Sequence, residues 1–261
     1  MSPAPYGRLP GRQQLRPTSQ SNVGLSVPVA ATFPLFNPLQ RMSWAAAFWA
    51  SDPLWANPGD GNRVSEWRDG SGNGRNVSQA TAQNQPRYVA NHPQLNNQPA
   101  IEFLNTRPDR LTSSSFTAVA QPNTWVAVFR FTGANTNEQM RLVDNNGIGA
   151  SRQLMGGRNA TEYVGNAGLA GVLTRSPNTE PSIMAWYANG ASSWVEVNRQ
   201  RSGLVSSGTS GVSGVGIGSD GSSSRLTAAV AFVGLYSGDV TNDAHWTAFL
   251  TWATNTYAIN G

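Results

Sequence analysis

Hydrophobic and polar residues alternate, or form short apolar runs, along most of this chain, and this pattern is typical of β-strands. The strongest run is residues 124–131, where β-branched and aromatic side chains occupy both sets of alternating positions, as in a strand buried on two faces. Asn189 and Gly190 separate two such runs, and this pair predicts a β-hairpin. Further strands are predicted at residues 45–50, 86–89, 100–104, 141–144, 182–187, 193–198 and 228–236.

The end of the chain departs from this pattern. Apolar residues recur three or four positions apart from Trp246 to Tyr257, which predicts one α-helix near residues 242–257. Thr241 or Asn242 can cap its first turn, where Asp243 is also favourable. The elements together predict an all-β protein, built as an antiparallel sandwich and closed by one C-terminal helix.

Residues 1–40 differ from the rest because prolines interrupt an apolar sequence. Proline is excluded from helix interiors and central strands, so this segment is not expected to fold alone. A disordered tail is one interpretation. We favour an extended N-terminal arm, separate from a domain over residues 41–261, because a solvated tail has little need of large apolar side chains. The arm residues expected to pack on neighbouring subunits are Leu25, Val27, Phe33 and Phe36.

Composition narrows the classes of function. The chain has no cysteine, which excludes disulfides and thiolate chemistry. All 18 basic residues are arginine, and the net charge of +4 is spread without a basic run, so we expect no nucleic-acid partner. We see no apolar stretch of membrane-spanning length and no secretion signal, so we expect no membrane insertion and folding in a cytoplasm.

The glycine-rich sequence Asp69-Gly-Ser-Gly-Asn-Gly74 offers alternating oxygen ligands. It is similar to a calcium loop, but a second carboxylate close by is missing. We favour an Asx-type turn in which glycines supply positive φ, and we interpret Asp144-Asn-Asn-Gly147 in the same way. The sequence therefore predicts no metal and no cofactor.

Two regions carry a family resemblance. Residues 65–112 contain, in order, Trp67 at a strand end, the glycine turn, a polar stretch and two strands, and residues 231–240 lead from a last strand into the helix. This order resembles the concanavalin A-like (LamG-type) jelly-roll domains found in bacterial surface proteins and phage virions. The resemblance extends from Trp44 to Ile259 and implies a concanavalin A-like antiparallel β-sandwich (jelly roll).

Catalytic groups are scattered. Some members of the resembled family are glucanases, whose retaining mechanism needs two carboxylates about 5–5.5 Å apart. Glu66 and Asp69 come closest to such a pair, and we interpret them as a turn-capping pair. We interpret His92 and His245 as surface histidines. We therefore expect a protein that is not an enzyme.

Aromatic and amide side chains remain as candidates for ligand binding, because sugar rings stack on aromatic faces and amides bond hydroxyls. Most tryptophans fall in apolar periodic stretches and are assigned to the core. On the predicted hairpin, Trp194 shares a strand face with Glu196 and Asn198, so that face is expected to be solvated. The candidate carbohydrate-binding residues are Trp186, Tyr187, Trp194 and Asn198.

The resemblance implies a phage virion structural protein, and we place a minor tail protein first, displaying a jelly roll that contacts host-surface glycans. A capsid decoration or head-fibre protein and a free lectin-like module are the alternatives. The expected partners are other virion proteins, further copies of the chain and a host cell-surface glycan. The expected location is the virion.

Overall fold

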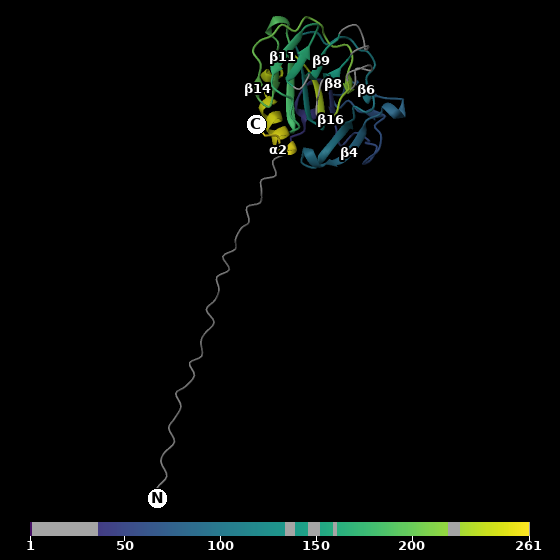
Figure 1. Cartoon of the computed structure of the whole chain (residues 1–261), viewed down its shortest axis with the longest axis vertical. Helices are drawn as coiled ribbons and strands as arrows, with labels where there is room; N and C mark the ends of the chain where they lie inside the picture. The colour runs from purple at the N-terminus through teal and green to yellow at the C-terminus, as the bar shows by residue number, and fades with distance from the viewer. Residues whose placement is uncertain (2–35, 134–138, 146–151, 159–160, 219–224, 261) are drawn as a thin grey trace. The chain divides into compact units, whose positions relative to one another are not determined.

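The computed structural model describes residue 1 and residues 36–133, 139–145, 152–158, 161–218 and 225–260. The chain divides into two units, Met1–Leu35 and Phe36–Gly261, and the second unit contains the helices and strands (Figure 1). Three of the predicted arm residues, Leu25, Val27 and Phe33, lie outside the described residues.

The described residues contain sixteen strands, which form two antiparallel sheets of eight strands each. In sheet A the order is β14-β13-β12-β7-β16-β5-β4, and β1 pairs with β16. Its strands are β1 (Trp44–Trp49), β4 (Arg87–His92), β5 (Gln98–Phe103), β7 (Asn123–Phe131), β12 (Ser182–Ala188), β13 (Trp194–Val197), β14 (Gln200–Arg201) and β16 (Ala228–Ser237).

In sheet B the order is β11-β10-β9-β8-β15-β6-β3-β2. Its strands are β2 (Glu66–Trp67), β3 (Val77–Ser78), β6 (Arg110–Thr112), β8 (Gln139–Asp144), β9 (Leu154–Arg158), β10 (Glu162–Asn166), β11 (Ala170–Thr174) and β15 (Gly216–Gly218). The other described elements are α1 (Pro38–Arg41), α2 (Trp246–Tyr257), and the 3-10 helices η1 (Ala82–Asn84), η2 (Pro93–Leu95), η3 (Gly190–Ser192) and η4 (Val240–Asn242).

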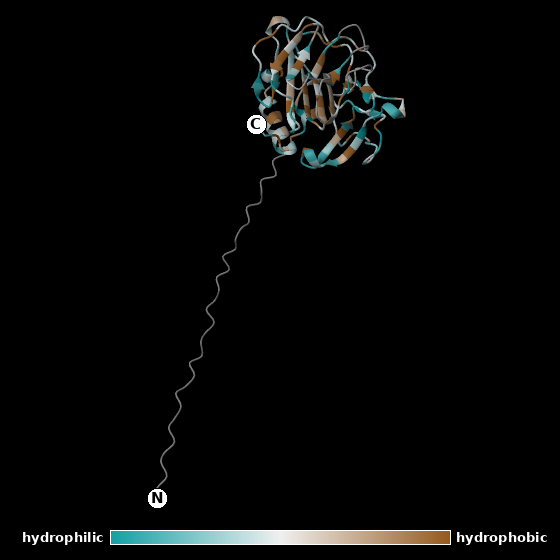
Figure 2. Ribbon diagram, viewed as in Figure 1, coloured by the Kyte–Doolittle hydropathy of each residue, from teal (hydrophilic) through white to brown (hydrophobic). Residues whose placement is uncertain are grey.

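Two apolar clusters explain why the central strands are hydrophobic on both faces. Along β7, Trp125 and Phe129 belong to the cluster between the sheets, while Val126 and Val128 belong to a second cluster that includes residues of α2. Successive strand residues point to opposite faces, so the helix covers the outer face of sheet A and excludes water from it. Hydrophobic residues accordingly gather on the strands and on α2 (Figure 2).

The structure confirms the predicted all-β sandwich, including the hairpin at Asn189-Gly190, where β12 pairs with β13. The predicted start of the C-terminal helix is wrong. Asp239 caps η4 by accepting a hydrogen bond from the Thr241 amide, so the segment before α2 forms a separate turn. Helix α2 begins at Trp246, and the carboxylate of Asp243 accepts a hydrogen bond from the His245 amide just before it.

Glycines of β15 mark places where backbones approach closely. A Cβ on Gly216 would lie 2.2 Å from the Asp144 carbonyl oxygen, and one on Gly218 would lie 2.5 Å from that of Asp109. Side chains at these positions would push the strand away from its neighbours. Glycine at these two positions therefore lets β15 pack closely against its neighbours.

The boundary between arm and domain lies earlier than predicted. Phe36 belongs to the second unit, where its ring centroid lies 6.5 Å from that of Phe249 and 6.0 Å from that of Trp252. Helix α1 follows directly, and the Trp44 indole donates a hydrogen bond to the Pro38 carbonyl oxygen at 2.8 Å. Phe36 therefore packs within its own chain, which corrects the expectation that it packs on a neighbouring subunit.

His92 is buried, which corrects its interpretation as a surface histidine. Burial lowers the pKa of its imidazole; the positive charge of Arg130 also lowers this pKa, and the carboxylate of Glu102 opposes the shift. Because the folded protein favours neutral His92, its contribution to stability is complete above the ordinary pKa of 6.5 and is lost as pH falls below it.

We expect the urea midpoint of unfolding to fall as pH is lowered from about 7.5 to about 5, and His92→Gln to flatten this decline. His245→Gln, which changes an exposed histidine, should leave the decline unchanged. An unaltered pH profile in His92→Gln would show that burial of this imidazole does not control acid stability.

Candidate functional site

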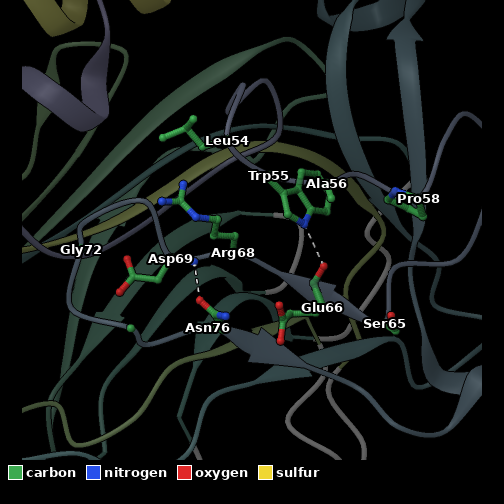
Figure 3. Close-up of a pocket in the computed structure, with 11 residues that line it drawn as sticks. Leu54, Trp55, Ala56, Pro58, Ser65, Glu66, Arg68, Asp69, Gly72 and Asn76 are labelled. Carbon is green, nitrogen blue, oxygen red and sulfur yellow. Dashed lines mark hydrogen bonds between the residues drawn. The ribbon is translucent and has the colours of Figure 1, made fainter.

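Hollows in the surface gather around the glycine turn of residues 69–76, which connects β2 to β3 at the edge of sheet B. The first hollow has a volume of about 490 Å³, which is within the usual range of small-ligand sites. It is lined by Leu54, Trp55, Ala56, Pro58, Ser65, Glu66, Arg68, Asp69, Gly72, Gly74 and Asn76 (Figure 3). We take this hollow, called the Glu66 pocket below, as the candidate functional site.

Asp69 anchors the glycine turn to the sandwich. Its side chain is buried, and one carboxylate oxygen accepts hydrogen bonds at 2.9 Å from the amides of Ala47 and Ser71. The other oxygen accepts one at 2.9 Å from the amide of Arg75. The turn is therefore tied to β1 of the other sheet by a charge-assisted set of hydrogen bonds, which holds the wall of the pocket in place.

The turn has the Asx-type geometry that the sequence predicts. Gly72 and Gly74 have φ values of +87° and +68°, which favour glycine. Asp69 bonds the amide two residues on, as in an Asx turn. Within the described ranges, no group of three or more His, Cys, Asp or Glu side chains is placed to hold a metal ion.

Glu66 is the exposed acid of the pocket. Its backbone carbonyl oxygen accepts a hydrogen bond from the Trp55 indole at 3.1 Å, which fixes the strand beneath (Figure 3). Its carboxylate has no hydrogen-bond or ion-pair partner in the described part of the chain. Ser65 and Asn76 are exposed beside it. The side-chain oxygen of Asn76 already accepts a hydrogen bond from the Asp69 amide at 3.0 Å (Figure 3). The pocket thus offers the carboxylate of Glu66, the hydroxyl of Ser65 and the side-chain N–H groups of Asn76 to a polar ligand.

Glu66 and Asp69, predicted to be a turn-capping pair, have separate roles in the structure. Asp69 does cap the turn, whereas the Glu66 side chain makes no capping hydrogen bond. The outward direction of Glu66 could be predicted from its position in the sequence, because neighbouring side chains on a strand alternate between faces. Trp67 points to the core, so Glu66 has to point outward.

An ion pair shapes the other wall. The Arg68 guanidinium lies 2.6 Å from the carboxylate of Asp52, and Asp52 also accepts a hydrogen bond from the Leu54 amide at 3.0 Å. Arg68 is therefore neutralised and does not offset the charge of Glu66. Leu54 itself is 72% exposed and gives the pocket an apolar edge.

Trp186 is fully buried between the two sheets, which corrects its prediction as a sugar-stacking residue. A Cβ on Gly165 would lie 2.0 Å from its ring, and one on Gly171 would lie 2.9 Å from it. The glycines of β10 and β11 therefore make the space that this indole fills, and a ligand cannot reach it.

The other predicted sugar residues do not gather around an open hollow either. Tyr187 and Trp194 are buried on the opposite face of sheet A, with ring centroids 5.4 Å apart. The Arg201 guanidinium covers the Trp194 ring at 3.8 Å, and Glu196 holds that guanidinium at 2.8 Å. The expectation of a solvated face is wrong, because a charged pair closes it.

Asn198 serves the turn after β13. Its side-chain oxygen accepts a hydrogen bond from the Ile183 amide at 2.8 Å, and its own φ is +48°. An asparagine tolerates this left-handed conformation better than most residues do. The structure thus gives Asn198 a backbone-capping role.

No family model matches the sequence, and no curated protein matches it. Solved structures show similarity of fold. The binding domain of botulinum neurotoxin DC, solved with rat synaptotagmin II, is 8% identical with a TM-score of 0.55, over 81% of this chain and 52% of that chain. Domain 4 of AbnA, a GH43 extracellular arabinanase from Geobacillus stearothermophilus solved with arabinotriose, is 9% identical with a TM-score of 0.51, over 76% and 100%.

Trypanosoma rangeli sialidase in complex with sialic acid is 12% identical with a TM-score of 0.47, over 82% of this chain. This chain spans 33% of the sialidase, so it corresponds to one part of a longer protein there. The two stronger similarities show a shared β-sandwich fold, in agreement with the fold that the sequence predicts. They do not link the chain to a virion.

Proposed function

We propose that this protein is a non-catalytic glycan-binding module, and that its ligand occupies the Glu66 pocket. The observation that carries the proposal is an open hollow of about 490 Å³ whose exposed carboxylate is unpaired among the described residues. Carboxylate and amide groups are suited to sugar hydroxyls, because they form charge-assisted and neutral hydrogen bonds with them.

Packing and hydrogen bonds hold the side chains beneath the pocket, which favours binding of a ligand to a preformed shape. Trp55 is buried against Trp67 and Tyr88, with ring centroids 6.2 Å and 5.6 Å away. Asp69 holds the opposite wall through its three amide hydrogen bonds. The side chains that contact a ligand are therefore held in position before the ligand binds.

Recognition is favoured over hydrolysis because the two carboxylates of the pocket are not equivalent. Retaining and inverting glycosidases use two carboxyl groups that both reach the scissile bond. Asp69 is buried and engaged by amides, so only Glu66 is exposed to a ligand. The similarity in fold to the arabinanase domain solved with arabinotriose supports a sugar as the ligand class.

We predict that Glu66→Gln lowers the affinity for the bound glycan about tenfold or more. A hydrogen bond to a charged group contributes about 1.5–3 kcal/mol, and each 1.4 kcal/mol is about tenfold in affinity. The measurement is isothermal titration calorimetry with the best ligand from a glycan array. Released reducing sugar, assayed on the same ligand, should remain at background.

Glu180→Gln is the matched control, because Glu180 is an exposed carboxylate outside the pocket with only a 3.9 Å contact to Arg130. It should leave affinity unchanged. Equal affinities for wild type and Glu66→Gln would move the ligand away from this pocket. An array on which the folded wild-type protein binds no glycan would refute the proposed function.

For the biological setting we retain the virion, as a minor tail protein first and a capsid decoration or head-fibre protein second. The feature that favours an assembled setting is the proline-interrupted apolar segment of residues 23–35, which precedes the sandwich. Apolar side chains in such a segment have to be buried against a partner to contribute binding energy. The partners would be other virion proteins or further copies of this chain.

Immunogold electron microscopy of purified particles tests this setting and separates tail from capsid. Label on the tail supports the first location, and label over the head supports the second. Particles that carry no label, while the antibody detects the free protein, would favour the free lectin-like module.

A further inference from the structure

We infer that a second subsite lies across the glycine turn from the Glu66 pocket, and that Arg75 there binds an acidic group of the same glycan. The inference rests on the proposed function and adds the substrate class: a chain in which a neutral sugar is followed by an acidic one.

Neighbouring hollows around the glycine turn share lining residues. A second hollow of about 290 Å³ shares Gly74 and Asn76 with the Glu66 pocket. A third, of about 690 Å³, shares Asn73, Arg75 and Thr117 with the second. Residues of the turn therefore line the Glu66 pocket on one side and the second and third hollows on the other. An oligosaccharide can extend across the turn more readily than a single sugar can fill both sides.

Arg75 is held in a fixed orientation between the second and third hollows. Its guanidinium lies 4.0 Å from the centre of the Phe116 ring and donates a hydrogen bond to the Ala45 carbonyl oxygen at 3.0 Å. Its backbone amide is fixed by Asp69. A guanidinium stacked in this way loses little freedom when it binds a ligand.

The charge of Arg75 is not neutralised by an ion pair among the described residues, in contrast to that of Arg68. A planar guanidinium with free N–H groups is suited to a carboxylate or a sulfate, which it can bind through two parallel hydrogen bonds. Ser114, Ser115 and Thr117 are exposed around it and can bond the remaining hydroxyls of an acidic sugar.

Glu66 sets the identity of the neighbouring sugar. An acidic sugar in its pocket would place two negative charges together, which disfavours binding. A neutral sugar beside Glu66 and an acidic one beside Arg75 satisfy both charges. The surface therefore favours a glycan in which a neutral sugar unit is next to an acidic sugar unit.

The test is a glycan array of matched pairs, each pair having the same neutral oligosaccharide with and without one uronate or one sulfate ester. We expect the acidic member to bind about tenfold or more tightly in at least one pair, and Arg75→Gln to abolish this difference. Comparison of the uronate pairs with the sulfate pairs shows which acidic group of the glycan Arg75 binds. The preference should weaken with added salt, because exposed charges are screened.

Arg75→Lys should restore only part of the preference, because an ammonium keeps the charge but not the planar fork. Arg41→Gln removes one exposed positive charge elsewhere and should change nothing. Thermal melting of each variant shows that the domain remains folded.

The outcomes separate the two proposals. Glu66→Gln should weaken both members of a pair, whereas Arg75→Gln should weaken only the acidic one. Equal binding of both members by wild type, or a preference unchanged in Arg75→Gln, would overturn the second subsite and leave the proposed function standing. Absence of binding across the array would overturn both.

Discussion

Replacing Trp186 with alanine is expected to lower the free energy of unfolding by about 3–5 kcal/mol, which is the usual cost of removing a large aromatic side chain from a core. The indole is fully buried between the sheets, and the glycines of β10 and β11 leave the space that it fills, because they have no Cβ. The backbone of β10 cannot collapse far into the space, because pairing with β9 and with β11, the edge strand of the described sheet, holds it on both sides. A large cavity should therefore remain.

A double-mutant cycle with Gly165→Ala makes this prediction specific. A Cβ at residue 165 would lie 2.0 Å from the Trp186 ring, so Gly165→Ala alone should also be destabilising. In the Trp186→Ala background the ring is gone, and the same methyl group should be neutral or stabilising. Urea unfolding of the four proteins measures the coupling. Additive effects would show that the two residues do not share this space.

The cycle also distinguishes the structural role of Trp186 from the binding role that the sequence predicts. A sugar-stacking tryptophan on the surface would lose ligand affinity on truncation with little change in stability. The strand pattern could not separate these roles, because Trp186 and Tyr187 are adjacent and point to opposite faces. Only the position of α2 against sheet A shows that both faces are covered.

The fold was largely readable from the chain because its strongest signals are local. The apolar run at residues 124–131 predicts a doubly buried strand, and β7 is that strand. The helix start was misplaced because Thr241, Asn242 and Asp243 all favour helix N-termini, and local preference does not show which carboxylate bonds which amide. Instead, the carboxylate of Asp239 accepts a hydrogen bond from the Thr241 amide and caps η4.

The candidate site was less readable because it depends on contacts between distant segments. Arg75 and Phe116 are 41 positions apart, and their stacking brings residues 114–117 to the glycine turn. Aromatic side chains are concentrated in residues 186–198 and favour that segment as a sugar site, whereas the open hollows lie where polar loops meet. Hydrophobic periodicity locates buried faces, but it carries no information on which loops come together.

The glycine turn itself should depend on one carboxylate. Asp69→Ala is expected to lower the free energy of unfolding by about 3 kcal/mol or more, because the amides of Ala47, Ser71 and Arg75 all lose their acceptor. A polar group that is left buried without a partner costs about 1–3 kcal/mol. Asp69→Asn keeps one acceptor oxygen, so it should fall between the wild type and alanine.

Asp60→Ala provides the comparison, because Asp60 is exposed and, among the described residues, its carboxylate accepts one hydrogen bond, from the Ala90 amide at 2.8 Å. It should cost less than Asp69→Ala, about 0.5–1.5 kcal/mol, because a single exposed hydrogen bond is lost and water can bind the freed amide. Both variants are measured by urea unfolding, and glycan binding is measured where the domain remains folded. Because the Glu66 pocket and the Arg75 subsite share the turn, Asp69→Asn should weaken neutral and acidic ligands together. An Asp69→Ala protein with the wild-type midpoint would show that other contacts hold the turn, and that the rigidity on which both subsites depend has a different origin.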